Sequence, residues 1–242
     1  MESLRTIVSD IRIFLYGGLL TLPLTLAGTL SILGLFTANY AVLFFLIGFL
    51  IVTPLASTIL NFALETLTIA VGFNPFKAKT SDVCRLVIPF ATAGAPSGPA
   101  TEGTEISSSY ASMIAFFIGY ILTNALELYN RQAEDGTLTV QTSSASDINS
   151  KVTSRKTQAL LAIISTAVVA MIIFGMRYSS GCESLFGLSL TSVLFGYMGY
   201  GWYKALSKVG QDRLSDLFGI ANRLLPPSAI TNAPIACVPV PA

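Results

Sequence analysis

Few side chains in this chain could do chemistry, since only 14 basic and 13 acidic side chains occur among 242 residues and none is histidine. The clearest pair is Arg177 and Glu183, six positions apart in the run Arg177-Tyr178-Ser179-Ser180-Gly181-Cys182-Glu183. A guanidinium suits bidentate contact with phosphate, and a glutamate carboxylate can serve as a nucleophile. The pair therefore indicates either an anion site or an internal ion pair.

Composition excludes several classes of function. A net charge of +1 provides no electrostatic footprint for nucleic acid, so no nucleic-acid partner is expected. Without histidine, the chain lacks the commonest catalytic base and a common metal ligand, and we expect no metal or cofactor. Three cysteines are too few for a disulfide-built scaffold. Apolar residues make up 52% of the chain, which predicts a polytopic membrane protein whose first partner is the lipid bilayer.

The elements that must position these residues follow from the charge-free stretches. Residues 13–76 contain one charge, Glu65, and 106–126, 157–176 and 184–203 contain none. A bilayer core of about 30 Å needs about 20 helical residues. The later stretches predict one span each. The first is long enough for three, with breaks near Thr37-Ala38-Asn39-Tyr40 and near Thr53-Pro54, although Pro54 could instead kink one long helix.

Counting Lys and Arg favours six spans over five. With six spans, 10 basic residues lie on the side of both termini, namely Arg5, Arg12, Arg131, Lys151, Arg155, Lys156, Lys204, Lys208, Arg213 and Arg223. The other 4 are Lys77, Lys79, Arg85 and Arg177, whereas five spans give 8 against 6. Because cytoplasmic loops are enriched in basic residues, the sequence predicts an all-α bundle of six transmembrane helices, with five as the alternative.

The segments outside the spans divide the chain further. We expect a bundle over 1–206, an amphipathic surface helix over 207–225 and an extended Pro-rich tail over 226–242. Two polar loops are expected at 73–107 and 129–156. The amphipathic pattern starts near residue 204 and consists of Leu206, Val209, Leu217, Ile220 and Leu224.

Some residues within the spans bear on helix packing. Small residues, which let helices approach closely, occur at Ala111, Ala115, Gly119, Gly196 and Gly199. Glu65 is expected to be a polar packing contact inside the bundle, with a helix-end position or part of a site as alternatives.

The motif order resembles the type 2 phosphatidic acid phosphatase superfamily, most closely its members in large DNA viruses. The loop from Arg177 to Glu183 is similar to the family's third motif (Arg, five residues, His, three residues, Asp). Ser107-Ser108-Ser109-Tyr110 stands where the second motif, Pro-Ser-Gly-His, begins a span; the literal Pro96-Ser97-Gly98-Pro99 is a less favoured register. Lys77 or Lys79 with Arg85 stands near the first motif. The resemblance covers residues 10–206 and implies a six-span fold.

The departures from the family's motifs imply an inactive protein. The family's nucleophilic histidine, its orienting aspartate and its acidic histidine correspond to Glu183, Gly187 and Tyr110. A phosphohistidine cannot form without histidine, and an unperturbed tyrosine is a poor general acid at neutral pH. We therefore predict a degenerate site at Ser108, Tyr110, Arg177, Glu183 and Gly187 with no catalytic activity.

The resemblance implies two further features, because the family's first and third motifs meet over one site. Arg85 and Arg177, with Lys77 and Lys79, could bind a lipid headgroup; alternatively the arginines pair with Glu183 or Glu105, or contact headgroups nonspecifically. Cys84 and Cys182 could form a disulfide, with both thiols reduced as the alternative and Cys237 remaining free.

These observations leave three hypotheses for function. The favoured one is a structural protein of a virion internal membrane derived from the host endoplasmic reticulum, whose C-terminal tail binds capsid or other virion proteins. The second is a lipid phosphatase with Glu183 as nucleophile. The third is a transporter, for which Glu65 and Pro54 are the only indications.

Overall fold

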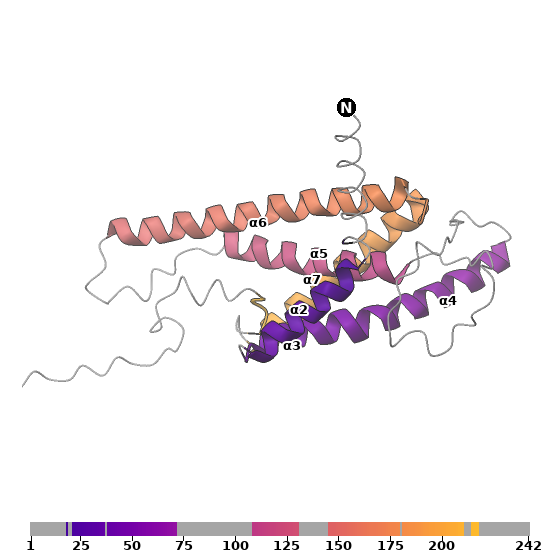
Figure 1. Ribbon diagram of the computed structural model, residues 1–242, viewed down its shortest axis with the longest axis horizontal. Coiled ribbons are helices and arrows are strands. Elements are labelled where there is room, and N and C mark those ends of the chain that lie inside the picture. The colour runs from indigo at the N-terminus through magenta and orange to yellow at the C-terminus, as the bar shows by residue number, and fades with distance from the viewer. Residues whose placement is uncertain are drawn as a thin grey trace, which may run out of the picture.

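A computed structural model describes residues 18, 21–36, 38–71, 108–130, 145–179, 181–210 and 214–217. The described residues are helical and contain no strand, which confirms the all-α prediction. In chain order (Figure 1) the helices are α2 (Leu22–Phe36), α3 (Tyr40–Ile47), a π-helical turn η1 (Gly48–Val52), α4 (Thr53–Val71), α5 (Ser109–Asn130), α6 (Ala145–Ser179) and α7 (Leu185–Gly210).

Helix α5 is the centre of the bundle and contacts α4, α6 and α7, while α2 packs mainly against α3. The rods run roughly side by side with alternating directions (Figure 1). Their core is aromatic: Phe45 packs edge-on against Tyr120 with ring centroids 4.9 Å apart, and Tyr120 against Tyr203 at 5.3 Å. Edge-to-face contacts of this kind add to the energy of burial, so α3, α5 and α7 are joined by their rings.

Of the two breaks predicted in the first apolar stretch, one is confirmed and one is wrong. The chain turns at Ala38 and Asn39, and the Asn39 side chain caps α3 by accepting from the Ala41 N–H. No helix ends at Thr53-Pro54, since the backbone is helical from Tyr40 to Val71 and crosses a membrane at most once. The alternative of one long helix through Pro54 is therefore correct, and the described helices do not confirm six spans.

The π-helical turn explains how the helix continues through Pro54. A proline ring clashes with the carbonyl four residues earlier, here that of Leu50. The wider turn over Gly48–Val52 relieves this clash, and the Thr53 N–H donates to the Gly48 carbonyl five residues back. The Thr53 hydroxyl donates to the same carbonyl at 2.9 Å. Proline thus changes the local pitch without ending the helix.

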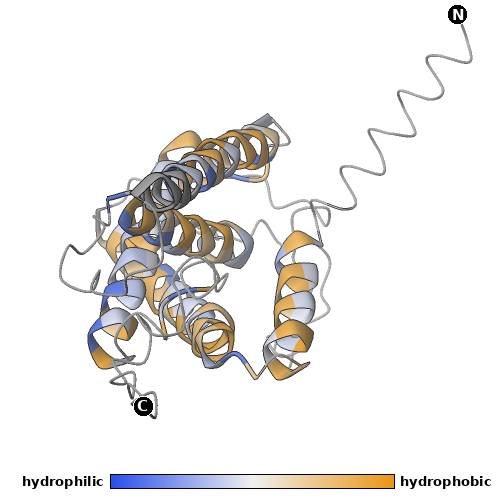
Figure 2. Ribbon diagram, turned by 90° about the vertical axis from the view of Figure 1, so that its left-hand side faces the viewer, coloured by the Kyte–Doolittle hydropathy of each residue, from blue (hydrophilic) through white to orange (hydrophobic). Residues whose placement is uncertain are grey.

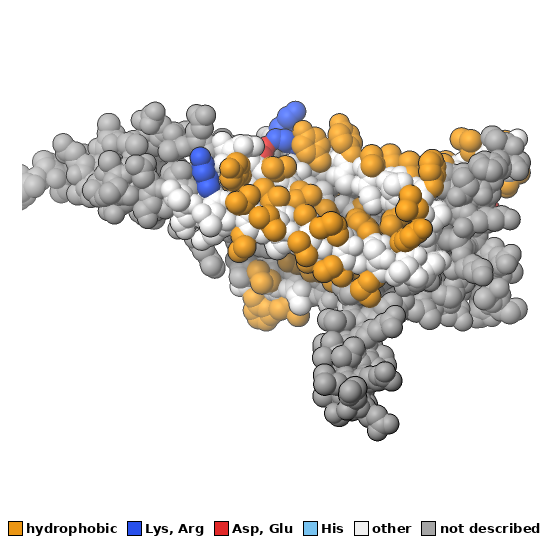
Figure 3. Space-filling model, turned by 90° about the horizontal axis from the view of Figure 1, so that it is seen from above, with side chains coloured by type: hydrophobic (Ala, Val, Ile, Leu, Met, Phe, Trp, Pro, Cys, Tyr) orange, Lys and Arg blue, Asp and Glu red, His pale blue; other side chains and the backbone are white. Residues whose placement is uncertain are grey.

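Three of the described helices are long and apolar enough to cross a membrane: Tyr40–Ala70, Ser109–Asn130 and Lys156–Ser179. Apolar residues cover the outward faces of the helices as well as the inward ones (Figure 2). The surface on the side of α6 is also largely hydrophobic, with few charged side chains (Figure 3). A helix that is apolar all round is buried or lies in lipid, so this surface identifies an integral membrane protein.

Glu65 is exposed, contrary to the prediction of a contact inside the bundle. Its depth follows from Ser57, whose hydroxyl lies 3.3 Å from that of Ser112 in the first turn of α5. At a rise of about 1.5 Å per residue, Glu65 lies about 12 Å beyond Ser57 along α4 and therefore past the start of α5. The Glu65 carboxyl therefore belongs to the end of α4 that projects beyond the bundle (Figure 1). This agrees with the alternative prediction of a helix-end position.

Glycines bring α5 and α7 into backbone contact. A Cβ built on Gly119 would lie 2.1 Å from the Gly196 carbonyl oxygen, and one on Gly199 would lie 2.2 Å from that of Phe116. Neither position tolerates a side chain without moving a helix. The prediction that small residues let these helices approach closely is confirmed for Gly119, Gly196 and Gly199.

Two segments differ from the predicted loop and surface helix. Helix α6 begins at Ala145, so the last twelve residues of the loop predicted at 129–156 are helical. Polar residues there extend the helix beyond its apolar part, and polarity alone does not end a helix. The surface helix expected over 207–225 is also wrong in part, because α7 continues to Gly210 and residues 214–217 lie in a turn. Leu206 and Leu217 belong to the protein core and do not face a membrane surface.

Two helices end in the same hydrogen-bonding pattern with different residues at the left-handed position. After α6, Gly181 has φ +69°, its N–H donates to the Tyr178 carbonyl, and the Cys182 N–H donates to that of Arg177. After α2, Ala38 has φ 50° with the equivalent bonds from Ala38 to Leu35 and from Asn39 to Gly34. Both are Schellman turns, for which glycine is the favoured residue.

Opposite substitutions at these turns should shift stability in opposite directions. Ala38→Gly removes the Cβ penalty of the left-handed conformation and should stabilise the protein by up to about 1 kcal/mol. Gly181→Ala adds that penalty and should destabilise by about 1 kcal/mol, since its Cβ meets nothing within 4 Å and only backbone strain changes. Thermal unfolding of the detergent-solubilised protein measures both; shifts of the same sign would contradict the assignment.

The glycine contact makes a second prediction with a control two residues away. Gly199→Ala should destabilise the protein by about 1–3 kcal/mol, because the added methyl overlaps the backbone of α5. Gly201→Ala, where a Cβ meets nothing within 4 Å, should be neutral or slightly stabilising through helix propensity. Thermal midpoints compare the two variants, and equal losses would show that α5 and α7 do not approach at Gly199.

Candidate functional site

Arg177 and Glu183 form a buried ion pair. Arg177 lies in the last turn of α6 and Glu183 lies two residues before α7, and the Schellman turn between them folds Glu183 back toward Arg177. The guanidinium donates to Glu183 Oε1 from Nη2 at 2.9 Å and from Nε at 3.2 Å. The two side chains are only 8% and 5% exposed. Each also stabilises a helix, since a cation suits the C-terminus of α6 and an anion the N-terminus of α7.

Ser108 joins this pair to α5 and uses all of its hydrogen-bonding capacity. As the N-cap of α5, its hydroxyl accepts from the Ala111 N–H at 3.1 Å. The same oxygen accepts from Arg177 Nη2 at 3.1 Å, and the hydroxyl donates to Glu183 Oε1. A serine hydroxyl has one donor and two acceptor positions, so all three are occupied.

The remaining predicted positions flank the pair. The Arg177 guanidinium lies over the ring of Tyr110, 4.6 Å from its centroid, in a cation–π contact. Gly187 lies in the first turn of α7, where its N–H donates to the Ser184 hydroxyl that caps this helix. The ring of Tyr110 therefore helps to enclose the cation, while Gly187 belongs to the helix cap.

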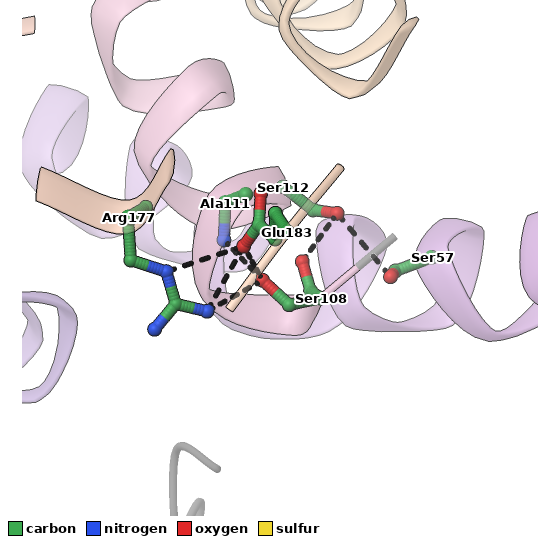
Figure 4. A network of polar contacts seen from close by, with 6 residues as sticks. All are labelled: Ser57, Ser108, Ala111, Ser112, Arg177 and Glu183. Carbon is green, nitrogen blue, oxygen red and sulfur yellow. Dashed lines mark hydrogen bonds and ion pairs between the residues drawn. The ribbon is translucent and has the colours of Figure 1, made fainter. Parts of the chain in front are cut away.

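The network continues into the bundle (Figure 4). The Ser112 hydroxyl lies one turn along α5 from Ser108, and donates to the Ser108 carbonyl at 3.0 Å. It also lies 3.3 Å from the Ser57 hydroxyl of α4. Ser57 and Ser112 are buried. Polar contacts thus connect α4, α5, α6 and the residue leading into α7.

A second polar cluster lies toward the opposite end of the α5–α7 pair. The Tyr120 hydroxyl donates to the Ser215 carbonyl at 2.9 Å, which holds the 214–217 turn against the core. Lys204 pairs with Glu127, and this hydrogen bond raises the pKa of the Lys204 ammonium above its usual value. Both side chains are more than a third exposed, unlike the Arg177–Glu183 pair.

The geometry indicates what the first cluster can do chemically. Glu183 Oε1 accepts hydrogen bonds from Ser108 and from two nitrogens of Arg177, the donors that would otherwise hold an external anion. No group of three or more Cys, Asp or Glu side chains in the described part of the chain could hold a metal. The cluster is a closed ion pair with an internal carboxylate in the anion position.

The structure brings together four of the predicted site residues, Ser108, Tyr110, Arg177 and Glu183. Pairing with Glu183 was the alternative to a headgroup clamp at Arg177. Lys77, Lys79, Arg85 and Cys84 lie outside the described residues. Sequence reasoning missed Ser57 and Ser112; their signal is hydroxyl residues recurring every fourth position, at Thr53 and Ser57 and at Ser108 and Ser112, within otherwise apolar helices.

No family model, curated protein or solved structure matches this chain. The resemblance to the phosphatase superfamily accordingly rests on the order and placement of the motifs alone. The function must therefore be argued from the geometry of the site.

Breaking the ion pair should cost far more than breaking the exposed pair at the other end. Glu183→Gln leaves the Arg177 cation buried without a counter-charge and should destabilise by about 3–5 kcal/mol. The control, Glu127→Gln, removes an exposed pair and should cost about 1 kcal/mol or less. Denaturation in detergent compares them. Arg177→Met combined with Glu183→Leu should recover most of the loss, and equal costs for the two single variants would contradict the burial argument.

The disulfide prediction concerns Cys182, which is buried and disulfide-bonded. Its partner lies outside the described residues, as do both other cysteines, Cys84 and Cys237. The pairing with Cys84 therefore stays a prediction. Alkylation without reductant followed by digestion should yield a linked Cys84–Cys182 peptide; a Cys182–Cys237 link, or two alkylated thiols, would contradict it.

Proposed function

We propose that this protein is a non-catalytic integral membrane protein with a structural role. One observation carries the proposal: Glu183, from within the chain, accepts from Nε and Nη2 of Arg177 and from the Ser108 hydroxyl. In a phosphatase resembling this arrangement, those donors would hold the phosphate. Here, a substrate phosphate would have to displace a buried carboxylate and would meet no histidine to attack it.

The closed network has a structural use of its own. It fixes the positions of α4, α5 and α6 and the entry to α7 through hydrogen bonds that lipid hydrocarbon chains cannot replace. Polar contacts between membrane helices stabilise a bundle whose apolar surfaces gain little by leaving lipid. A phosphatase-like protein retained as a scaffold would have such a buried ion pair in place of its catalytic groups.

In its specific form, the proposal places the protein in the internal membrane of a large DNA virus, derived from the host endoplasmic reticulum. Its support is the resemblance of the Arg177–Glu183 loop to viral members of the phosphatase superfamily. The C-terminal tail would bind capsid or other virion proteins; residues 226–242 lie outside the described part of the chain.

An assay and a copy-number measurement test the proposal. The purified full chain in mixed micelles should release phosphate from phosphatidic acid no faster than Arg177→Ala or Glu183→Gln. Turnover that is lost in both variants would contradict it and favour the lipid phosphatase with Glu183 as nucleophile.

The structural role requires a fixed copy number relative to the capsid protein in purified particles. Truncation after Pro227 should leave membrane insertion intact and reduce incorporation. Variable copy number, or full incorporation of the truncated chain, would contradict the scaffold role or the tail's part in it.

A further inference from the structure

After α7 the chain returns to the bundle and places four residues, 214–217, against it. Helix α7 ends at Gly210, which is seven residues, or about 10 Å, beyond Tyr203. Tyr203 nevertheless hydrogen-bonds with the Ser215 side chain. Three of the four residues are buried, namely Ser215, Asp216 and Leu217. Residues 214–217, named the strap, are therefore a docked turn that follows the last helix.

The strap reaches the depth of the central helix. Tyr120 is eleven residues from the start of α5 and ten from its end, and α5 is long and apolar enough to cross a membrane. The Tyr120 hydroxyl donates to the Ser215 carbonyl at 2.9 Å. That carbonyl therefore lies within one tyrosine side chain of the middle of α5. Non-helical backbone at this depth must be enclosed by protein, because lipid chains cannot hydrogen-bond to it.

A buried donor beside this contact makes no hydrogen bond. Asn124 follows Tyr120 by one turn of α5 and Glu127 follows at the next turn, so the three side chains share one side of the helix. Asn124 is 2% exposed, and its Nδ2 has no hydrogen-bond partner among the described residues. A buried donor without a partner costs more free energy than a typical hydrogen bond contributes. The docked state therefore bears a cost at Asn124 that water would remove.

Docking also takes a carboxylate out of water. Asp216 is 6% exposed in the docked strap, and the removal of its hydration opposes docking. The charged side chains nearby on the packed helices are Glu127 and Lys204, which pair with each other. Burial of Leu217 in the core and the hydrogen bond from Tyr120 favour docking. The free energy of docking is thus a difference between opposing contributions.

We propose that the strap is a conformational device that releases from the bundle while the helices stay folded. Release lets water reach Asn124 and Asp216 and restores the hydration that docking removes. The aromatic core does not need the strap, because the Tyr120 ring packs against those of Phe45 and Tyr203. Docking holds the point from which the chain continues beyond Leu217, and release frees it.

Alkylation of a cysteine placed in the strap measures this release. Ser215→Cys, in the full chain in detergent micelles, is followed by mass spectrometry of its own peptide. It should react more slowly than Ser154→Cys, which is exposed near the start of α6. It should react at least about tenfold faster than Ser112→Cys, which is buried inside the bundle. A rate equal to that of Ser154→Cys would mean that the strap is not docked, and one equal to that of Ser112→Cys would mean that exposure requires unfolding; either overturns the proposal.

Two substitutions on α5 should change this rate in opposite directions. Tyr120→Phe removes a hydrogen bond to the strap and should raise the alkylation rate about three- to tenfold. Asn124→Leu removes the donor that lacks a partner, at similar size, and should lower the rate at least about fivefold. The matched control, Tyr129→Phe, alters an exposed tyrosine near the end of α5 and should leave the rate unchanged. Faster alkylation with Asn124→Leu, or no change with Tyr120→Phe, would overturn the proposal.

Hydrogen exchange of the chain without an added cysteine checks that Ser215→Cys does not itself cause release. The amides of the strap should exchange faster than those of α5 around Tyr120, since release is a local opening. Exchange at the strap should be fastest in Tyr120→Phe, intermediate in the wild type and slowest in Asn124→Leu. The reverse order, or exchange at the same rate as α5 in every variant, would contradict a releasable strap.

Discussion

The close approach of α5 and α7 is the constraint on which the rest of the described structure depends. Apolar helices gain little by leaving lipid for one another, so their association needs close backbone packing. Gly119, Gly196 and Gly199 provide it. Once these backbones touch, Ser108 and Glu183 meet near one end of the pair, and Glu127 and Lys204 meet near the other. The two polar clusters are consequences of one packing geometry.

Polar side chains inside this bundle are largely satisfied by one another. Ser108 uses every hydrogen-bonding position, Arg177 binds Glu183 through two nitrogens, and Ser112 lies beside Ser57. A buried ion pair of this kind recovers its desolvation cost only with good geometry and added hydrogen bonds. The same contacts occupy Nε and Nη2 of Arg177 and the Ser108 hydroxyl, which are donors that an external phosphate would need, and this supports the proposal of a scaffold over that of an enzyme.

Hydropathy does not specify the depth of a residue in the membrane or the direction in which it faces, and three residues or segments of this chain depart from prediction for that reason. Hydropathy leaves open whether Pro54 ends a span or kinks one long helix, and the π-helical turn keeps the helix continuous. Glu65 was placed inside a span because apolar residues surround it, whereas Ser57 contacts α5 at its first turn and carries Glu65 beyond the bundle. The apolar positions Leu206 and Leu217 have the spacing of a surface helix, but they pack into the core of their own chain.

The sequence by itself determined that this is a helical membrane protein and that Arg177 and Glu183 lie close, because charge-free stretches of span length and a six-residue loop between two of them admit few alternatives. It also indicated the helix contacts at Gly119, Gly196 and Gly199 through the spacing of small residues. Only the tertiary structure decided that Ser108, 69 residues from Arg177, completes the pair, and that the carboxylate fills the anion position. Local patterns report turns, caps and periodicity, whereas contacts between distant residues depend on how helices pack and at what depth they meet.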